Sequence, residues 1–197
     1  MFGQQMSIPL VIGGPSGVGK SSFCEFLRKE GWLYLEADQY EHEKDGIDEL
    51  GLRAAWNQFW NCHDARALAD ELMRRQNDSQ SAGVVLSLPS CAVPSVQHLQ
   101  AAKGLLLIHF LYGDPRFCLA AFAGRERATG RNLPALQLHW DGNNKTVFMT
   151  LSTSPYHSHL INVFHEDGQR CSWKEVYDKI RAEQNAARNR DPSEGSR

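Results

Sequence analysis

Short apolar runs alternate with amphipathic segments over most of the chain, from residue 8 to residue 182. In residues 64–76 the apolar side chains recur at intervals of three and four, which predicts an amphipathic helix. Residues 105–112 are apolar almost throughout, as expected for a strand that is covered on both faces. The same criteria predict strands at 8–12, 32–35, 84–88, 105–112 and 160–164, and helices at 20–30, 64–76, from Pro94, at 115–128 and from the capping box of Ser172 and Glu175.

The alternation of strands and helices favours an α/β fold, in which a parallel sheet carries helices on both faces. Two segments, 45–61 and 131–159, contain helical fragments and are longer than a structural connection requires. Residues 185–197 contain no large apolar side chain, which predicts a disordered tail. We therefore expect a single domain over residues 1–184, followed by this tail.

Composition narrows the class of protein only a little. The chain of 197 residues is 42% hydrophobic and has a formal net charge of -2, so it lacks the basic excess of a nucleic-acid-binding protein. Its longest apolar stretch, 104–113, is too short to span a membrane. The cysteines are scattered without a CxxC pair, so neither a disulfide framework nor a zinc site is expected. Residues 1–7 contain no Lys or Arg, unlike a secretory signal, and we expect a cytoplasmic protein.

One motif carries specific chemistry: residues 14–21, Gly-Pro-Ser-Gly-Val-Gly-Lys-Ser, match the phosphate-loop pattern GxxxxGK[ST] in full. An apolar run precedes the motif and an amphipathic segment follows it, as in a strand–loop–helix unit. The glycines allow backbone N–H groups to face phosphate oxygens, Lys20 is expected to reach the β- and γ-phosphates of ATP, and the Ser21 hydroxyl is expected to bind Mg²⁺. The candidate nucleotide-binding residues are Gly14, Ser16, Gly17, Val18, Gly19, Lys20, Ser21 and Ser22.

Other motifs exclude several classes of nucleotide-binding protein. A GTPase is expected to carry Asn-Lys-x-Asp, but Asn144-Lys145 is followed by Thr-Val. An ABC-type ATPase would need Leu-Ser-Gly-Gly-Gln, which the sequence lacks. These absences favour a small kinase.

The phosphate loop, together with Leu-Glu-Ala-Asp at 35–38 and Leu-Tyr-Gly-Asp at 111–114 before an arginine-bearing helix, resembles the superfamily of shikimate kinases, gluconate kinases and nucleoside monophosphate kinases. The resemblance implies a three-layer α/β/α P-loop NTPase fold with a five-stranded parallel sheet. It also implies a helical lid, at about 124–146, and a small-molecule acceptor beside the nucleotide.

The resemblance also implies roles for individual residues. Asp38 is expected to contact the acceptor as base or orienting group, and Glu36 to help hold Mg²⁺ through water. Arg125 and Arg131 are expected to close over the transferred phosphoryl group as catalytic lid arginines. Relatives hold adenine mainly with backbone atoms in the loop after the last strand, which here is 165–168.

Two departures from the family pattern leave alternatives open. No acidic residue ends the third strand, where Ser87 and Ser90 are the candidates to replace it. The acceptor motifs of named members are absent as well. The leading hypothesis is an ATP- and Mg²⁺-dependent kinase acting on a small metabolite; the alternatives are a nucleotide-binding regulatory module without transfer activity and a kinase that phosphorylates nucleotides. Monomer and dimer both remain open.

Near the expected acceptor segment, Arg53, Trp56, Phe59 and Trp60 occur at helical spacing. They could line a substrate pocket. A buried core stripe is the favoured interpretation of this spacing.

Overall fold

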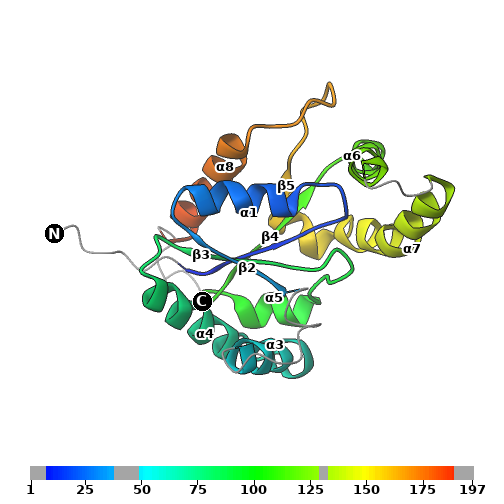
Figure 1. The fold of residues 1–197 in the computed structure, drawn as a ribbon. Coiled ribbons are helices and arrows are strands. Elements are labelled where there is room, and N and C mark those ends of the chain that lie inside the picture. Colours follow the sequence, from blue (N-terminus) through cyan, green and yellow to red (C-terminus); the bar gives the residue numbers. More distant parts are fainter. Residues whose placement is uncertain (1–7, 38–48, 129–132, 189–197) are drawn as a thin grey trace, which may run out of the picture.

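The computed structural model describes residues 8–37, 49–128 and 133–188 (Figure 1). Its centre is a sheet of five parallel strands in the order β2-β3-β1-β4-β5, as the resemblance implied. The strands are β1 (Leu10–Gly13), β2 (Leu33–Glu36), β3 (Val84–Ser87), β4 (Leu107–Tyr112) and β5 (Leu160–Asn162). The sheet is therefore doubly wound around β1, the strand that leads into the phosphate loop.

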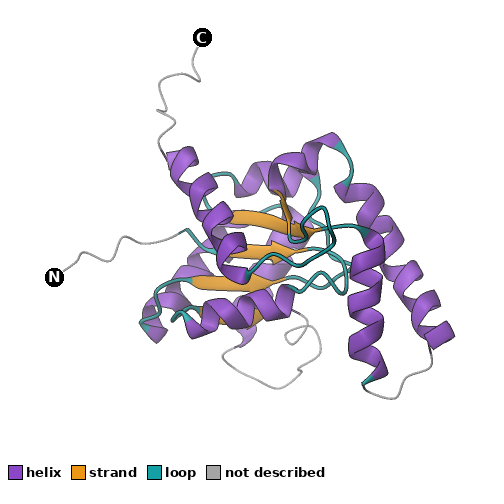
Figure 2. Cartoon of the chain, turned by 90° about the horizontal axis from the view of Figure 1, so that it is seen from above, coloured by secondary structure: helices purple, strands orange, loops and turns teal. Residues whose placement is uncertain are grey.

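Helices cover both faces of the sheet and complete the expected three-layer α/β/α architecture. Helices α1 (Lys20–Lys29) and α8 (Trp173–Arg188) lie on one face, and α3 (Glu49–Cys62), α4 (Ala65–Ser79) and α5 (Val96–Ala102) lie on the other (Figure 1). Helices α6 (Pro115–Arg127) and α7 (Leu133–Leu151) pack side by side at the end of the sheet where the strands finish (Figure 2), and a 3₁₀ turn (Ser154–His159) leads from α7 into β5.

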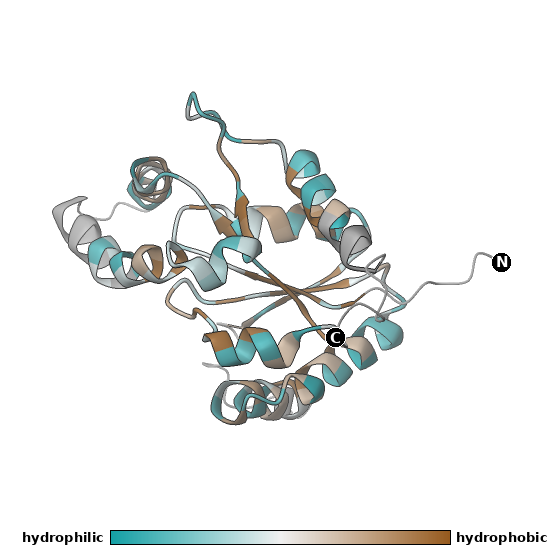
Figure 3. Cartoon of the chain, turned by 180° about the vertical axis from the view of Figure 1, so that it is seen from behind, coloured by the Kyte–Doolittle hydropathy of each residue, from teal (hydrophilic) through white to brown (hydrophobic). Residues whose placement is uncertain are grey.

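The two faces of each strand enter two separate hydrophobic clusters. Leu10 and Ile12 of β1 belong to the cluster that includes α1 and α8, whereas Val11 belongs to the cluster that includes α3, α4 and α5. All three side chains are fully buried. Figure 3 shows the matching pattern, with hydrophobic residues along the strands and hydrophobic and hydrophilic bands on the helices. Continuous apolar strands are therefore required here, because neither face of the sheet meets water.

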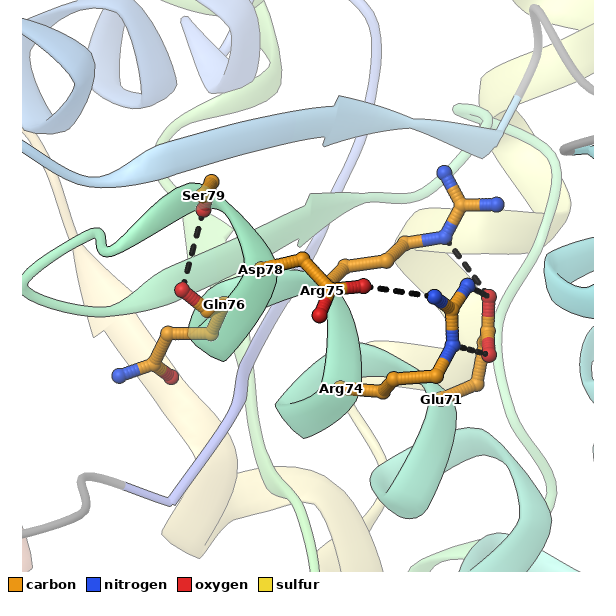
Figure 4. Close-up of polar contacts among 6 residues, drawn as sticks. All are labelled: Glu71, Arg74, Arg75, Gln76, Asp78 and Ser79. Carbon is orange, nitrogen blue, oxygen red and sulfur yellow. Dashed lines mark hydrogen bonds and ion pairs between the residues drawn. The ribbon is translucent and has the colours of Figure 1, made fainter.

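Charged residues of α4 pair with one another on its surface (Figure 4). Glu71 accepts hydrogen bonds from Arg74 and Arg75, and Arg74 also pairs with Asp78 at 2.7 Å. The Arg74 guanidinium holds the pKa of the Glu71 carboxyl below its ordinary value. Gln76, at the buried side of the same helix, donates to the Ser81 carbonyl and helps end the helix. The Arg74–Asp78 pair is exposed on both sides and contributes little to stability, whereas the apolar face of α4 is buried against the sheet.

The structure assigns both segments whose architecture the sequence left ambiguous. Most of 45–61 and 131–159 is helical, in α3, in α7 and in the 3₁₀ turn. Helix α8 continues to Arg188, so the expected domain end at residue 184 falls within a helix rather than at its end. No helix in the described ranges is both long enough and apolar enough to cross a membrane.

Two histidines are buried in the fold, where burial favours their neutral form, and one of them connects two helices. The Nδ1 atom of His98 accepts a hydrogen bond from the Ser95 N–H at 2.9 Å, which caps α5, and its Nε2 atom lies 3.1 Å from the Trp60 carbonyl at the end of α3. Burial lowers the pKa of His98. His109 in β4 is only 2% exposed, and burial lowers its pKa to about 4.

These histidines predict a loss of stability in acid. Between pH 6.5 and 4 the unfolded chain binds a proton at residue 109 and the folded chain does not. The free energy of unfolding is therefore highest above pH 6.5 and decreases as the pH falls below this value. For His109 alone, the free energy of unfolding should fall by about 2 kcal/mol between pH 8 and pH 5. Urea unfolding of the wild type and His109→Gln at these two pH values measures the difference. Equal pH dependence in the two proteins would contradict the prediction.

Candidate functional site

A cleft of about 560 Å³ opens at the carboxyl ends of β1, β2 and β3. In an α/β sheet with this strand order, the carboxyl edge beside the first strand is where ligands bind. Residues from the phosphate loop, from the ends of β2 and β3, from α6 and from the segment before α8 line the cleft. They are Ser16, Gly17, Gly19, Lys20, Ser21, Ser22, Glu36, Ser87, Leu88, Ser90, Ala121, Arg125, Arg170 and Trp173.

The phosphate loop joins β1 to α1 in the conformation that its glycines permit. Gly14, Gly17 and Gly19 have φ values of 129°, 83° and 102°, a region that side chains with a Cβ rarely adopt. Gly19 also serves as the N-cap of α1, which gives the loop the positive end of that helix. The local geometry is that of an anion-binding loop.

Every carbonyl oxygen from residue 14 to residue 18 accepts a hydrogen bond. Lys20 Nζ donates to the carbonyls of residues 14 and 15, at 2.8 and 3.3 Å. Trp140 Nε1 donates to the carbonyl of residue 16 at 3.2 Å, and the Arg170 guanidinium donates to those of residues 17 and 18 at 3.1 and 2.9 Å. In the described part of the chain, the N–H groups of Gly17 and Gly19 have no protein acceptor. The loop thus uses its negative dipole ends internally and retains N–H donors for an anion.

The Lys20 side chain is buried in this loop, 9% exposed. Besides the two carbonyls, its ammonium donates to the Ser90 hydroxyl at 2.9 Å. Ser90 follows β3 and is one of the two serines proposed from sequence to replace an acidic residue there. The structure brings Ser90 to Lys20 rather than to Ser21, with which it shares no hydrogen bond among the described residues.

Ser21 and Glu36 form the oxygen-donor pair that a divalent cation needs. The Ser21 hydroxyl donates to Glu36 Oε1 at 3.1 Å, and the Tyr34 hydroxyl donates to the same oxygen at 2.6 Å. Burial and this hydrogen bond raise the pKa of Tyr34, so the phenol stays protonated as a donor. A hydroxyl and a carboxylate at the edge of the phosphate loop suit Mg²⁺, which prefers oxygen ligands and usually keeps several waters.

The third strand, β3, adds no charged residue to the cluster of Ser21, Tyr34 and Glu36. Ser87, its last residue, is 2% exposed and lies in register with Glu36 on β2 and with Ile12 on β1. Within the described ranges, Glu36 is therefore the carboxylate that the register places beside the carboxyl end of β3. Sequence reasoning noted the missing acidic residue, and the register shows which neighbouring strand provides one.

Of the expected acceptor and lid residues, the structure describes Arg125 but neither Asp38 nor Arg131, both of which lie outside the described ranges. Arg125 lines the cleft from α6. Its side chain is 63% exposed and pairs with Glu126 at 2.7 Å. Its guanidinium also lies 5.4 Å from the centre of the Phe122 ring. Arg125 can thus present its charge to a ligand in the cleft.

Arg170 is a residue of the cleft that sequence reasoning missed. Arg170 forms an antiparallel bridge with Phe164, and this bridge closes a short hairpin. The Arg170 guanidinium lies 5.0 Å from the centre of the Phe164 ring and 5.3 Å from that of the Trp173 ring. Burial lowers the pKa of Arg170. Only its place after the last strand, next to the segment 165–168 assigned to adenine by resemblance, could have drawn attention to it.

The aromatic residues of α3 lie in the core, as their spacing favoured. Trp56 and Phe59 are 7% and 0% exposed and belong to the cluster on the α3–α4 face. Trp60 packs against them and against His98. None of these residues, nor Arg53, lines the cleft.

Comparison with known proteins finds likeness only among solved structures; no protein-family model and no curated protein matches the chain. A gluconokinase from Sinorhizobium meliloti 1021 is 18% identical, with a TM-score of 0.47 over 92% of this chain and 94% of its own. A shikimate kinase from Bacteroides thetaiotaomicron is 16% identical, with a TM-score of 0.44 over 92% and 98%. A dephospho-CoA kinase from Campylobacter jejuni is 14% identical, with a TM-score of 0.42 over 93% and 98%. All three of these structures are kinases by name, while the activity and substrate of this chain must be inferred from its own residues.

The close packing at Gly19 generates a prediction. A Cβ at this position would collide with the Arg170 guanidinium and lie 2.6 Å from the Trp173 ring, at a φ of +102°. Gly19→Ala should therefore weaken binding of a nucleoside triphosphate by about 100-fold or more and lower the melting temperature. Calorimetric titration and thermal unfolding measure the two effects.

Gly124 provides the matched control for this substitution. It lies within α6, and a Cβ there would meet nothing within 4 Å. Gly124→Ala should raise the free energy of unfolding by about 0.5–1 kcal/mol and leave nucleotide binding unchanged. Wild-type affinity in Gly19→Ala would show that the loop does not need this backbone conformation.

Proposed function

We propose that this protein is an ATP- and Mg²⁺-dependent phosphotransferase that moves the γ-phosphoryl group to a hydroxyl or phosphate oxygen of a small metabolite. One observation carries the proposal: a phosphate loop with its carbonyls engaged, Lys20, and the Ser21–Glu36 pair all face the same cleft. An anion-binding loop alone would fit many ligands. A lysine, a hydroxyl and a carboxylate beside it together suit a metal-bound nucleoside triphosphate.

Within this proposal, the loop and Lys20 bind the nucleotide. The N–H groups of Gly17 and Gly19 donate to phosphate oxygens, and the Lys20 ammonium reaches the β- and γ-phosphates. Ser21 and Glu36 hold Mg²⁺, Ser21 directly and Glu36 through water. When bound, Mg²⁺ offsets the charge on the β- and γ-phosphate oxygens.

Transfer then requires positioning more than covalent chemistry. The bond between the γ-phosphorus and the β–γ bridging oxygen breaks, and a bond forms between that phosphorus and an acceptor oxygen, which leaves ADP. If the acceptor is a hydroxyl, its proton passes to a base, a role that we assign to Asp38 from its place two residues after Glu36. Arg125 and Arg131 are proposed to balance the charge that spreads over the transferred group.

The lysine provides the first test of nucleotide binding. Lys20→Ala should weaken ATP binding in the presence of Mg²⁺ by about 100-fold, because the variant loses the cation at the phosphates. Lys29→Ala, an exposed position in the last turn of the same helix, is the control and should bind like the wild type. Calorimetry with the full chain measures both affinities.

The same titration separates the alternatives when it is extended to a panel of acceptors. ADP formation that depends on an added metabolite supports a kinase, and competition by nucleoside monophosphates would indicate a nucleotide acceptor. Nucleotide binding without transfer to any acceptor would favour a regulatory module, for which the uncharged Ser87 at the end of β3 is the motivating observation. If the wild type binds no ATP, the proposal is wrong.

A charge-removing variant tests the metal site. Glu36→Gln keeps the size of the side chain and can still accept from Tyr34, so the local fold should persist. The Mg²⁺ concentration for half-maximal ATP binding should rise by about tenfold, because a carboxylate is lost from the metal's surroundings. Glu30→Gln, exposed just after α1, should leave the metal dependence unchanged. An identical Mg²⁺ requirement in Glu36→Gln would remove Glu36 from the site.

A further inference from the structure

The phosphate loop is held from outside by α7, a helix more than 120 residues away in sequence. The Oδ1 atom of Asn144 accepts a hydrogen bond from the Ser16 N–H at 2.7 Å, and Trp140 Nε1 donates to the Ser16 carbonyl at 3.2 Å. Both backbone groups of Ser16 are therefore bonded to α7. Ser16 was expected to bind nucleotide, and its N–H serves this internal contact instead.

The surroundings of the Asn144 side chain hold it in the orientation that this contact needs. It is 1% exposed, and its Nδ2 atom donates to the Trp140 carbonyl at 2.9 Å, one turn earlier in α7. An acceptor must face the Ser16 N–H and a donor must face the Trp140 carbonyl, so these two partners fix the orientation of the amide. The Trp140 ring is fixed in turn, because it is 5% exposed and packs against Phe148.

Ser16 occupies the position in the loop where such a contact has the greatest effect. Gly17 follows it directly and Gly14 lies two residues before it, both at positive φ, and glycines leave a backbone free to rotate. Immobilising the Ser16 peptide groups limits the rotation on both sides of that residue. The direction of the Gly17 N–H, a proposed phosphate donor, then depends on α7. Preorganised donors bind an anion more tightly because less ordering remains at the moment of binding.

We propose that Asn144 is a positioning residue for the phosphate loop, setting through Ser16 the geometry in which the loop binds a nucleoside triphosphate. The inference rests on the proposed function for its ligand. It adds to that function a structural connection between the proposed triphosphate site and α7, the helix that contains the second half of the expected lid, 124–146. Trp140 supports the same contact through the Ser16 carbonyl.

The test compares Asn144→Ala with Val147→Ala in the full chain. Val147 lies on the same helix and is 3% exposed, but it belongs to the hydrophobic cluster on the α3–α5 face and has no contact with the loop among those described. Asn144→Ala should weaken ATP binding about tenfold, the size expected for one lost buried hydrogen bond. Val147→Ala should lower the melting temperature and leave the affinity unchanged.

Kinetics and a second variant separate positioning from general damage. If transfer activity is present, Asn144→Ala should raise the KM for ATP with a much smaller change in kcat, since the contact acts on binding. Trp140→Phe keeps an aromatic ring, although a smaller one, and removes the donor to Ser16, and should weaken ATP binding about threefold. The double variant should lose less than the product of the two effects, because both act through one residue.

Hydrogen exchange of the loop distinguishes failure of the inference from failure of the proposed function. In Asn144→Ala the Ser16 N–H loses its acceptor, so the peptide covering residues 10–23 should exchange faster than in the wild type and in Val147→Ala. If the wild type binds no ATP, the proposed function fails, and faster exchange would still support the positioning role. Unchanged exchange together with unchanged affinity in Asn144→Ala would overturn the inference.

Discussion

The site depends on one electrostatic requirement: a loop that binds an anion must direct its N–H groups toward the ligand and keep its carbonyl oxygens away from it. Five successive carbonyls, in residues 14–18, meet this requirement by accepting hydrogen bonds from Lys20, Trp140 and Arg170. The donors come from α1, from α7 and from the segment before α8. The doubly wound sheet brings these three parts of the chain to one edge, so the loop geometry is a product of the whole fold rather than of its own residues.

A second requirement concerns negative charge. P-loop enzymes of the kind that the sequence resembles commonly place a carboxylate at the end of the third strand, where this chain has the buried, uncharged Ser87. The parallel register puts Glu36 beside Ser87, and the Ser21 and Tyr34 hydroxyls both donate to Glu36. A hydroxyl at the end of the loop and a carboxylate from β2 thus lie together at the side of the cleft that is proposed to hold Mg²⁺. An uncharged end of β3 is therefore compatible with a metal-dependent site, because Glu36 of β2 can provide the carboxylate.

The sequence predicts the parts of this arrangement that are local in the chain. The glycines and Lys20 identify the loop because a fixed spacing produces a fixed backbone shape, and apolar runs identify the strands because both faces of the sheet are buried. Arg170, Asn144 and Trp140 could not be found in this way. Each reaches the loop from more than 120 residues away, through side-chain geometry that no spacing encodes. Helix α8 continues past residue 184 because polar residues can extend a helix whose apolar face is anchored at Val176 and Ile180.

The internal hydrogen bonds of the cations determine which of them can respond to a ligand. Arg170 donates to two carbonyls and is half-buried between aromatic rings, so moving it would expose the negative ends of those carbonyls. Lys20 also donates to two carbonyls, but phosphate oxygens are charged acceptors and form stronger hydrogen bonds with an ammonium than neutral carbonyls do. Arg125 pairs with the Glu126 carboxylate at 2.7 Å; the arginine side chain is 63% exposed, whereas the carboxylate side chain is only 9% exposed. Arg170 therefore holds the loop, while Lys20 is the cation that can exchange its carbonyl acceptors for the phosphate oxygens of the proposed nucleotide, and Arg125 offers an exposed guanidinium at the cleft.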